Sequence, residues 1–235
     1  MRIVTADKTI KAIDSIIETE QKSAPLRTYC GVSYIGHDCD RYIYISYHNL
    51  YKPNLSGRII RLLDRGNDEE ERFIRLLNKV GVQVKDRQKE VVINNLIKGH
   101  IDGIATGLKE SKTRHVIEFK TSNDKNFKKL IKEGLKKAKF QHYVQLNTYM
   151  YGLNIPRGFY LVVNKNTDEL YSEKIRLDED VVKYHIDRAT DICNSPVMPP
   201  KKSENPSWYE CKLCQFYNFC HKQNVEISEE LLTWY

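Results

Sequence analysis

Apolar residues in the first third of the chain recur every three or four positions, which is the spacing of amphipathic helices. Ile10, Ile13 and Ile17 are the clearest example. A later stretch contains Gly66 and is followed by Gly81, and glycine commonly ends helices. The pattern predicts one helix over residues 6–22, another over residues 33–47, and two helices within residues 56–80 that are separated near Gly66.

Beyond this region, short stretches rich in β-branched residues alternate with polar turns, which is typical of strands. The expected strands are residues 82–84, 91–97, 100–105 and 115–121. The expected helices after them are residues 124–137, 139–152 and 178–193. Before the last helix, residues 157–164 and 168–175 should form a hairpin around Asn164-Lys165-Asn166.

The order of these elements predicts an α/β protein, in which a mostly contiguous sheet with one crossover is flanked by helices. The chain of 235 residues is long enough to bury a core. We expect a single domain, residues 1–235. Its expected parts are a helical N-terminal part (1–81), a core (82–195) and a cysteine-rich C-terminal segment (196–235) that packs back on the N-terminal part.

The composition is 40% hydrophobic and 29% charged, which is ordinary for a globular protein. No apolar run approaches the roughly 20 residues that a membrane span needs. The charged N-terminus does not have the pattern of a secretion signal. These observations favour a cytoplasmic protein with no membrane partner.

Two carboxylates and a lysine form the strongest chemical signal. Asp102 follows a predicted strand, while Glu118 and Lys120 share one face of a later strand because they are two residues apart. Converging carboxylates suit a hard cation such as Mg²⁺ or Mn²⁺, with the backbone carbonyl of Phe119 as a further candidate ligand. The cation would polarise a phosphate and activate a water, which Lys120 would orient. The alternative is a structural Glu118–Lys120 ion pair on a half-exposed sheet.

The stretches Gly99-His-Ile-Asp-Gly103 and Ile117-Glu-Phe-Lys-Thr121 resemble motifs II and III of the RecB-like branch of PD-(D/E)xK nucleases. That branch includes phage recombination exonucleases and CRISPR-adaptation nucleases, and it carries Gln-x-x-x-Tyr on the next helix. Gln145 and Tyr149 match this motif and share a helix face, although a core tyrosine beside a solvated glutamine is the alternative. The resemblance implies a restriction-endonuclease-like core, a central mixed sheet flanked by helices. It implies catalytic roles for Asp102, Glu118, Lys120, Gln145 and Tyr149.

The same branch has an upstream helical motif with a glycine, a histidine and often glutamates. The matching stretch here runs from Arg65 to Arg72, with Asn67 in place of the histidine. The resemblance assigns a metal-ligand role to Glu70, with its neighbour Glu69 as the alternative. A charged first turn of a helix would explain the same acids without any metal.

Three of the six cysteines form a C-x2-C-x5-C pattern, namely Cys211, Cys214 and Cys220. The RecB-like branch adds one distant N-terminal cysteine and so closes a clasp on a [4Fe–4S] cluster. Cys39 lies in a segment that resembles the family's cysteine-then-arginine segment, and Cys30 is the runner-up. The cluster would have a structural role, because it joins distant parts of the chain.

Other interpretations of the cysteines stay open. Cys211, Cys214 and Cys220 could hold Zn²⁺ together with His221, or they could simply be buried as apolar side chains. Cys193 is expected to be a free buried thiol.

The formal net charge is +7, and seven lysines lie between residues 125 and 139 with Glu133 as the sole acid. Such clusters attract polyanions, above all nucleic acid, and a solvated surface is the alternative. The lysines that we expect to bind DNA are Lys125, Lys128, Lys129, Lys132 and Lys136.

These features together predict a stand-alone, metal-dependent deoxyribonuclease, a phage-type exonuclease that acts on DNA ends in recombination or repair. An endonuclease or a CRISPR-adaptation-like processing nuclease would have the same motifs. A non-catalytic DNA-binding protein is the alternative from another class. A recombination annealing protein is a candidate partner, and a homo-oligomer is left open.

Overall fold

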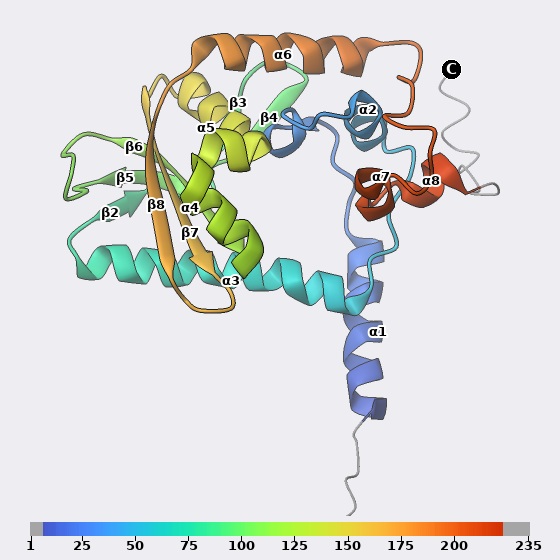
Figure 1. Cartoon of the computed structure of the whole chain (residues 1–235), viewed down its shortest axis with the longest axis horizontal. Coiled ribbons are helices and arrows are strands. Elements are labelled where there is room, and N and C mark those ends of the chain that lie inside the picture. The colour runs from blue at the N-terminus through green and yellow to red at the C-terminus, as the bar shows by residue number, and fades with distance from the viewer. Residues whose placement is uncertain (1–6, 223–235) are drawn as a thin grey trace, which may run out of the picture.

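The computed structural model describes residues 7–222 (Figure 1). The helices are α1 (Asp7–Ser23), the short 3₁₀ helix η1 (Val32–Tyr34), α2 (Asp40–His48), α3 (Gly57–Lys79), α4 (Asp124–Ala138), α5 (Phe140–Gly152), α6 (Glu179–Asn194), α7 (Tyr209–Leu213) and α8 (Tyr217–His221). The strands are β1 (Cys30–Gly31), β2 (Gln83–Lys85), β3 (Glu90–Val92), β4 (Ile97–His100), β5 (Gly103–Thr106), β6 (His115–Ser122), β7 (Arg157–Asn164) and β8 (Leu170–Arg176). None of the helices in this range is long and apolar enough to cross a membrane.

A five-stranded mixed sheet has the order β2-β5-β6-β7-β8. Its central pair, β6 and β7, is parallel, and the other three pairs are antiparallel. Because parallel neighbours need a crossover, the chain passes through α4 and α5 between these two strands. The predicted α/β class, the crossover and the β7–β8 hairpin are confirmed.

A second, three-stranded sheet has the order β1-β4-β3 and corrects the prediction of one contiguous sheet. The stretch 91–97 is not a single strand, because β3 ends at Val92 and β4 begins at Ile97. The side chain of Asn94 causes this turn, since its Oδ1 accepts hydrogen bonds from the backbone N–H groups of Leu96 (2.9 Å) and Ile97 (2.8 Å). The chain then leaves this sheet after β4 and enters the other one at β5.

Helix α3 is continuous through Gly66, so the prediction of two helices within residues 56–80 was wrong. A glycine inside a helix costs only about 1 kcal/mol relative to alanine. The packing of Phe73, Ile74 and Leu77 against one face of the five-stranded sheet outweighs that cost. Helix α3 therefore spans the sheet as one rigid element, below the strands in Figure 1.

The prediction of one helix over residues 33–47 was also wrong. The 3₁₀ helix ends at Tyr34, and α2 begins only at Asp40. Cys39 has an extended backbone, and its N–H donates to Nδ1 of His37 at 3.0 Å. This local hydrogen bond replaces a helical one, so residues 35–39 form a loop.

Strand β6 separates two apolar cores because its side chains alternate between the sheet faces. Ile117 and Phe119 face α3, where the ring of Phe119 stacks on that of Phe73 with centroids 5.0 Å apart. Val116 faces the other core, to which α4, α5 and α6 contribute. Glu118 and Lys120 must then lie on the same side as Val116.

The segment around α7 and α8 packs beside α2 (Figure 1). The ring of Phe216 lies 4.9 Å from that of Tyr42, and Arg41 donates from Nε to the backbone oxygen of Pro199 at 2.7 Å. Gln215 donates to the hydroxyl of Tyr42 at 2.9 Å. The end of the described chain is thus held against its N-terminal part. Residues 223–235 of the predicted C-terminal segment lie outside the described range.

Candidate active site

Asp102 lies where the chain crosses from the three-stranded sheet to the five-stranded one. It sits between the end of β4 and the start of β5, beside the middle of β6. Its Oδ2 accepts a hydrogen bond from the backbone N–H of Phe119 at 2.6 Å. This bond brings the carboxylate next to the strand that carries Glu118 and Lys120.

Glu118 and Lys120 form an ion pair on one face of β6, so the predicted shared face is confirmed. The Glu118 side chain is completely buried, whereas that of Lys120 is partly exposed. One carboxylate oxygen of Glu118, Oε2, is buried and has no hydrogen-bond partner among the described residues. A buried carboxylate oxygen without a partner is costly and marks a position where a positive group would be stabilised.

Three carboxylates from three parts of the chain, those of Glu118, Asp102 and Glu70, have raised pKa values at this site. Burial raises the pKa of Glu118 to about 8, against the lowering effect of Lys120, and the charges of Asp102 and Glu70 add to the rise. Burial also raises the pKa of Asp102 and that of Glu70. For Lys120, burial works against the charged form, but the three acids around it raise its pKa. The site is an acidic cluster that one ammonium group only partly neutralises.

Glu70, on α3, interacts electrostatically with this cluster, since the charges of Asp102 and Lys120 act on its carboxyl. The Glu70 carboxylate accepts a hydrogen bond from Gln88 at 3.0 Å. Glu69 instead pairs with Arg72 at 2.8 Å, in the same helix. Of the two acids that the sequence left open, Glu70 is the one whose pKa responds to the charge of Asp102.

Gln145 and Tyr149 are four residues apart on α5 and so lie on the same face of the helix. Burial raises the pKa of Tyr149, and the charges of Glu118 and Asp102 raise it further, so its hydroxyl lies in the field of the acidic cluster. A Cβ atom on Gly99 would stand only 2.6 Å from that hydroxyl. The glycine before the Asp102 turn thus leaves room for the tyrosine.

Sequence reasoning missed a partly buried His142–Tyr160 pair at the same site. Nδ1 of His142 lies 2.7 Å from the hydroxyl of Tyr160, which is directly opposite Glu118 in the β6–β7 pairing. Burial lowers the pKa of His142 to about 3, and the charge of Lys120 lowers it too, so the ring is neutral. One signal was available in the sequence, because His142 stands three residues before Gln145 and so shares its helix face.

The predicted DNA-binding lysines lie along α4, but they do not form one uninterrupted cationic face. Gly134 has a φ of +73°, which kinks the helix between Lys132 and Lys136. Three of the five lysines already have partners, with Lys128 on Asp124 (2.8 Å), Lys129 on Glu133 (3.8 Å) and Lys136 on Asp178 (2.8 Å). Lys125 and Lys132 have no ion pair within residues 7–222.

Four cysteines line one cavity between α2 and the C-terminal helices, namely Cys39, Cys211, Cys214 and Cys220. Burial raises the pKa of Cys214, and the charges of the other three cysteines raise it as well. Burial also raises the pKa of Cys220, and the Arg41 guanidinium beside it offsets only part of that rise. This donor set of thiols next to a guanidinium fits a site where thiolates bind a metal centre.

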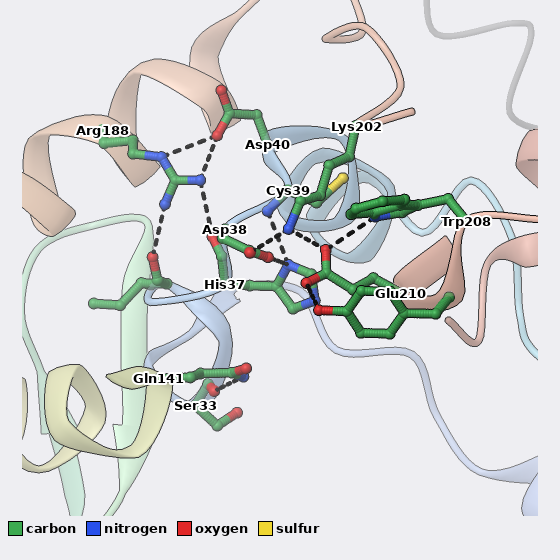
Figure 2. A network of polar contacts seen from close by, with 12 residues as sticks. Ser33, His37, Asp38, Cys39, Asp40, Gln141, Arg188, Lys202, Trp208 and Glu210 are labelled. Atoms are coloured by element: carbon green, nitrogen blue, oxygen red, sulfur yellow. Dashed lines mark hydrogen bonds and ion pairs between the residues drawn. The ribbon is translucent and has the colours of Figure 1, made fainter. Parts of the chain in front are cut away.

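Cys30 lies elsewhere, in the apolar core against Cys193, and both are free thiols. Cys30, the alternative for the fourth cysteine ligand, therefore does not line this cavity. Polar contacts fix the Cys39 loop to the C-terminal segment and to α6 (Figure 2). Lys202 bridges Asp38 and Glu210, while Arg188 donates from its guanidinium to the backbone oxygen of His37 at 2.8 Å.

In the part of the chain that the structure describes, no three His, Cys, Asp or Glu side chains stand close enough together to bind one metal ion directly. The donors at the acidic cluster still fit a hard cation, since they are carboxylate oxygens and one of them lacks a partner. The role of the Phe119 carbonyl as a ligand stays a prediction.

No protein-family model matches the sequence, and no curated protein matches it either. Several solved structures share the fold. The crystal structure of the protein SSO0001 is similar to this chain with 19% identity and a TM-score of 0.55, covering 93% of this chain and 98% of the other. An alkaline exonuclease from Laribacter hongkongensis is similar with 15% identity and a TM-score of 0.51, covering 74% of this chain and 90% of the other. At such identities the comparison shows a common fold.

Proposed function

We propose that this protein is a metal-dependent deoxyribonuclease that hydrolyses DNA phosphodiester bonds and works on DNA ends as an exonuclease. The observation that carries the proposal is that a hydrogen bond holds Asp102 against the strand of the Glu118–Lys120 ion pair, where the charge of Glu70 also acts. The shared fold with an alkaline exonuclease supports it. Endonucleolytic cutting would use the same chemistry and differs only in how the strand enters the site.

The acidic cluster suits Mg²⁺ or Mn²⁺, which would supply Lewis-acid activation of the phosphate and of a water. Asp102 and Glu118 would hold the ion through carboxylate oxygens, and Glu70 would add its charge at longer range, since Mg²⁺ keeps several waters and binds one or two carboxylates directly. Lys120 lies on the same face and would neutralise charge that grows on the phosphate oxygens. The Gln145–Tyr149 pair would position the attacking water or a phosphate oxygen, since the tyrosine hydroxyl stays protonated and can donate.

We also propose that Cys39, Cys211, Cys214 and Cys220 hold a [4Fe–4S] cluster in a structural role, with Zn²⁺ as the alternative. The support is that these four thiols share one cavity with Arg41. The cluster would hold residues 37–51 against the α7–α8 segment, and so it would close a long loop of chain. Redox chemistry is not required for that role.

A nuclease assay on labelled linear DNA and on closed circular DNA, each with Mn²⁺, tests the proposal. Linear DNA should be degraded from its ends, and closed circles should stay intact. Glu118→Gln should lower the rate by about 100-fold or more because a buried acid of the cluster loses its charge. The exposed Glu20→Gln variant of α1 is the matched control. Cutting of circles would instead indicate an endonuclease, and DNA binding without cleavage under any divalent metal would indicate a binding protein.

A further inference from the structure

A polar cavity of about 150 Å³ opens at the C-terminal end of β6, next to the acidic cluster. Its lining includes Ser122, Asn126, Lys139, His142 and Lys165. Among the described residues, no aspartate or glutamate lines it. The volume equals several water molecules, so a phosphate group fits inside.

Three relationships connect this cavity to the reactive centre. Lys120 and Ser122 are two residues apart on one face of β6, which is about 6.6 Å along a strand. His142 lines the cavity and also lies in the field of Lys120. Tyr160 lines the cavity and stands directly opposite Glu118. A strand of DNA whose scissile phosphate lies at Lys120 would therefore place a neighbouring phosphate here.

The charges in the cavity favour an anion. Lys139 comes from the α4–α5 junction and Lys165 from the β7–β8 turn, and neither ammonium has an ion pair within residues 7–222. Burial lowers the pKa of Lys139, as does the charge of Lys129, so an anion beside Lys139 would stabilise its charged form. His142 is neutral and bonded to Tyr160, which leaves the two lysines as the cationic contacts.

We propose that this cavity binds a backbone phosphate of the DNA strand next to the phosphate that is cut, with Lys139 and Lys165 as the contacts. The inference rests on the proposed nuclease function and deepens it, because it names how the strand is held in register. Phosphate contacts position a strand and carry no base information. The cavity should therefore strengthen binding equally for all sequences.

The test measures DNA affinity by fluorescence anisotropy over a range of KCl concentrations, for wild type and for the Lys139→Gln/Lys165→Gln double variant. Removing two phosphate contacts should weaken binding by about tenfold or more at low salt, and the slope of log K against log salt should fall by about one per lysine. The Michaelis constant should rise while kcat changes little, as expected for uniform binding. Lys8→Gln, an exposed lysine of α1, is the matched control.

A second arm replaces single phosphates near the DNA end with neutral methylphosphonate linkages, one position at a time. At one position the wild type should lose affinity and the double variant should not, because the two changes remove the same contact. Equal losses in both proteins at every position would overturn the proposal. If inorganic phosphate competes with DNA but no methylphosphonate position changes the affinity, the cavity binds a free anion. That result would also overturn the proposal.

The two arms separate this proposal from the proposed function. If wild type cuts DNA, Glu118→Gln does not, and the lysine variants behave like Lys8→Gln, then only the phosphate site is wrong. A wild-type protein that neither binds nor cuts DNA would overturn both.

Discussion

The Oδ2 atom of Asp102 accepts a hydrogen bond from the backbone N–H of Phe119, at 2.6 Å. This contact joins the crossing point between the two sheets to the centre of β6. Since Phe119 turns its ring toward α3, its neighbours Glu118 and Lys120 face the other way. The acidic cluster therefore forms where strand β6 sets the position of Glu118 and a hydrogen bond to that strand sets the position of Asp102.

Asp102→Asn should remove the charge of this residue and keep its hydrogen bond to the backbone of Phe119. The amide oxygen can still accept from Phe119, so the fold should persist and its stability should stay within about 1 kcal/mol of wild type. Metal-dependent cleavage should fall by about 100-fold or more because a charged ligand is lost. Asp187→Asn, an exposed residue of α6, controls for the loss of any acid. Near wild-type cleavage by Asp102→Asn would remove the proposed role.

The metal-free protein should lose stability as the pH rises through neutrality. The pKa of Glu118 is raised to about 8 in the fold, above its ordinary value near 4.5, so folding favours its protonated form. That stabilisation is fully present below about pH 4.5 and is lost as the pH rises through about 8. Denaturant unfolding at several pH values, with a chelator present, measures it.

The fall in unfolding free energy with rising pH should be weaker in Glu118→Gln, because the glutamine side chain does not titrate. Adding Mn²⁺ at about pH 8 should restore stability to wild type, since a cation replaces the proton as the neutralising group. An identical pH slope in wild type and in Glu118→Gln would contradict the assignment of this group.

Gly99→Ala should disturb the site through Tyr149. The added Cβ would lie 2.6 Å from the tyrosine hydroxyl and 3.2 Å from Cβ of Val32, so we expect a loss of about 1–3 kcal/mol in the free energy of unfolding and a slower reaction. Thermal denaturation should show part of that stability returning in the Gly99→Ala/Tyr149→Phe double variant. Gly66→Ala is the control, because its Cβ meets nothing within 4 Å. It should stabilise the helix by about 0.5–1 kcal/mol.

Cys39→Ser and Cys30→Ser should behave differently toward the proposed cluster. Protein purified without oxygen should be brown and contain iron and acid-labile sulfide. Cys39→Ser should lose both, and its C-terminal segment should become sensitive to proteolysis. Cys30→Ser should keep them, since Cys30 lies against Cys193 and away from the cavity. Colourless wild-type protein with one zinc ion per chain would reverse the assignment to iron and sulfur.

Short-range periodicity made several features predictable from the sequence. Residues two apart on a strand share a face, which is why the strand pattern alone pairs Glu118 with Lys120. Residues four apart on a helix also share a face, so Gln145 and Tyr149 could be placed together. The β7–β8 hairpin and the α/β class followed from the same local patterns.

Only the tertiary structure decided the choices that depend on distant parts of the chain. Local patterns treat Glu69 and Glu70 alike, and it is the packing of α3 on the sheet that brings Glu70 into the field of Asp102 while Glu69 pairs with Arg72. Local patterns also could not distinguish Cys39 from Cys30. The packing of α7 and α8 places the three C-terminal cysteines at one cavity with Cys39. The physical reason is that periodicity determines which side chains share a face, whereas long-range packing determines what that face meets.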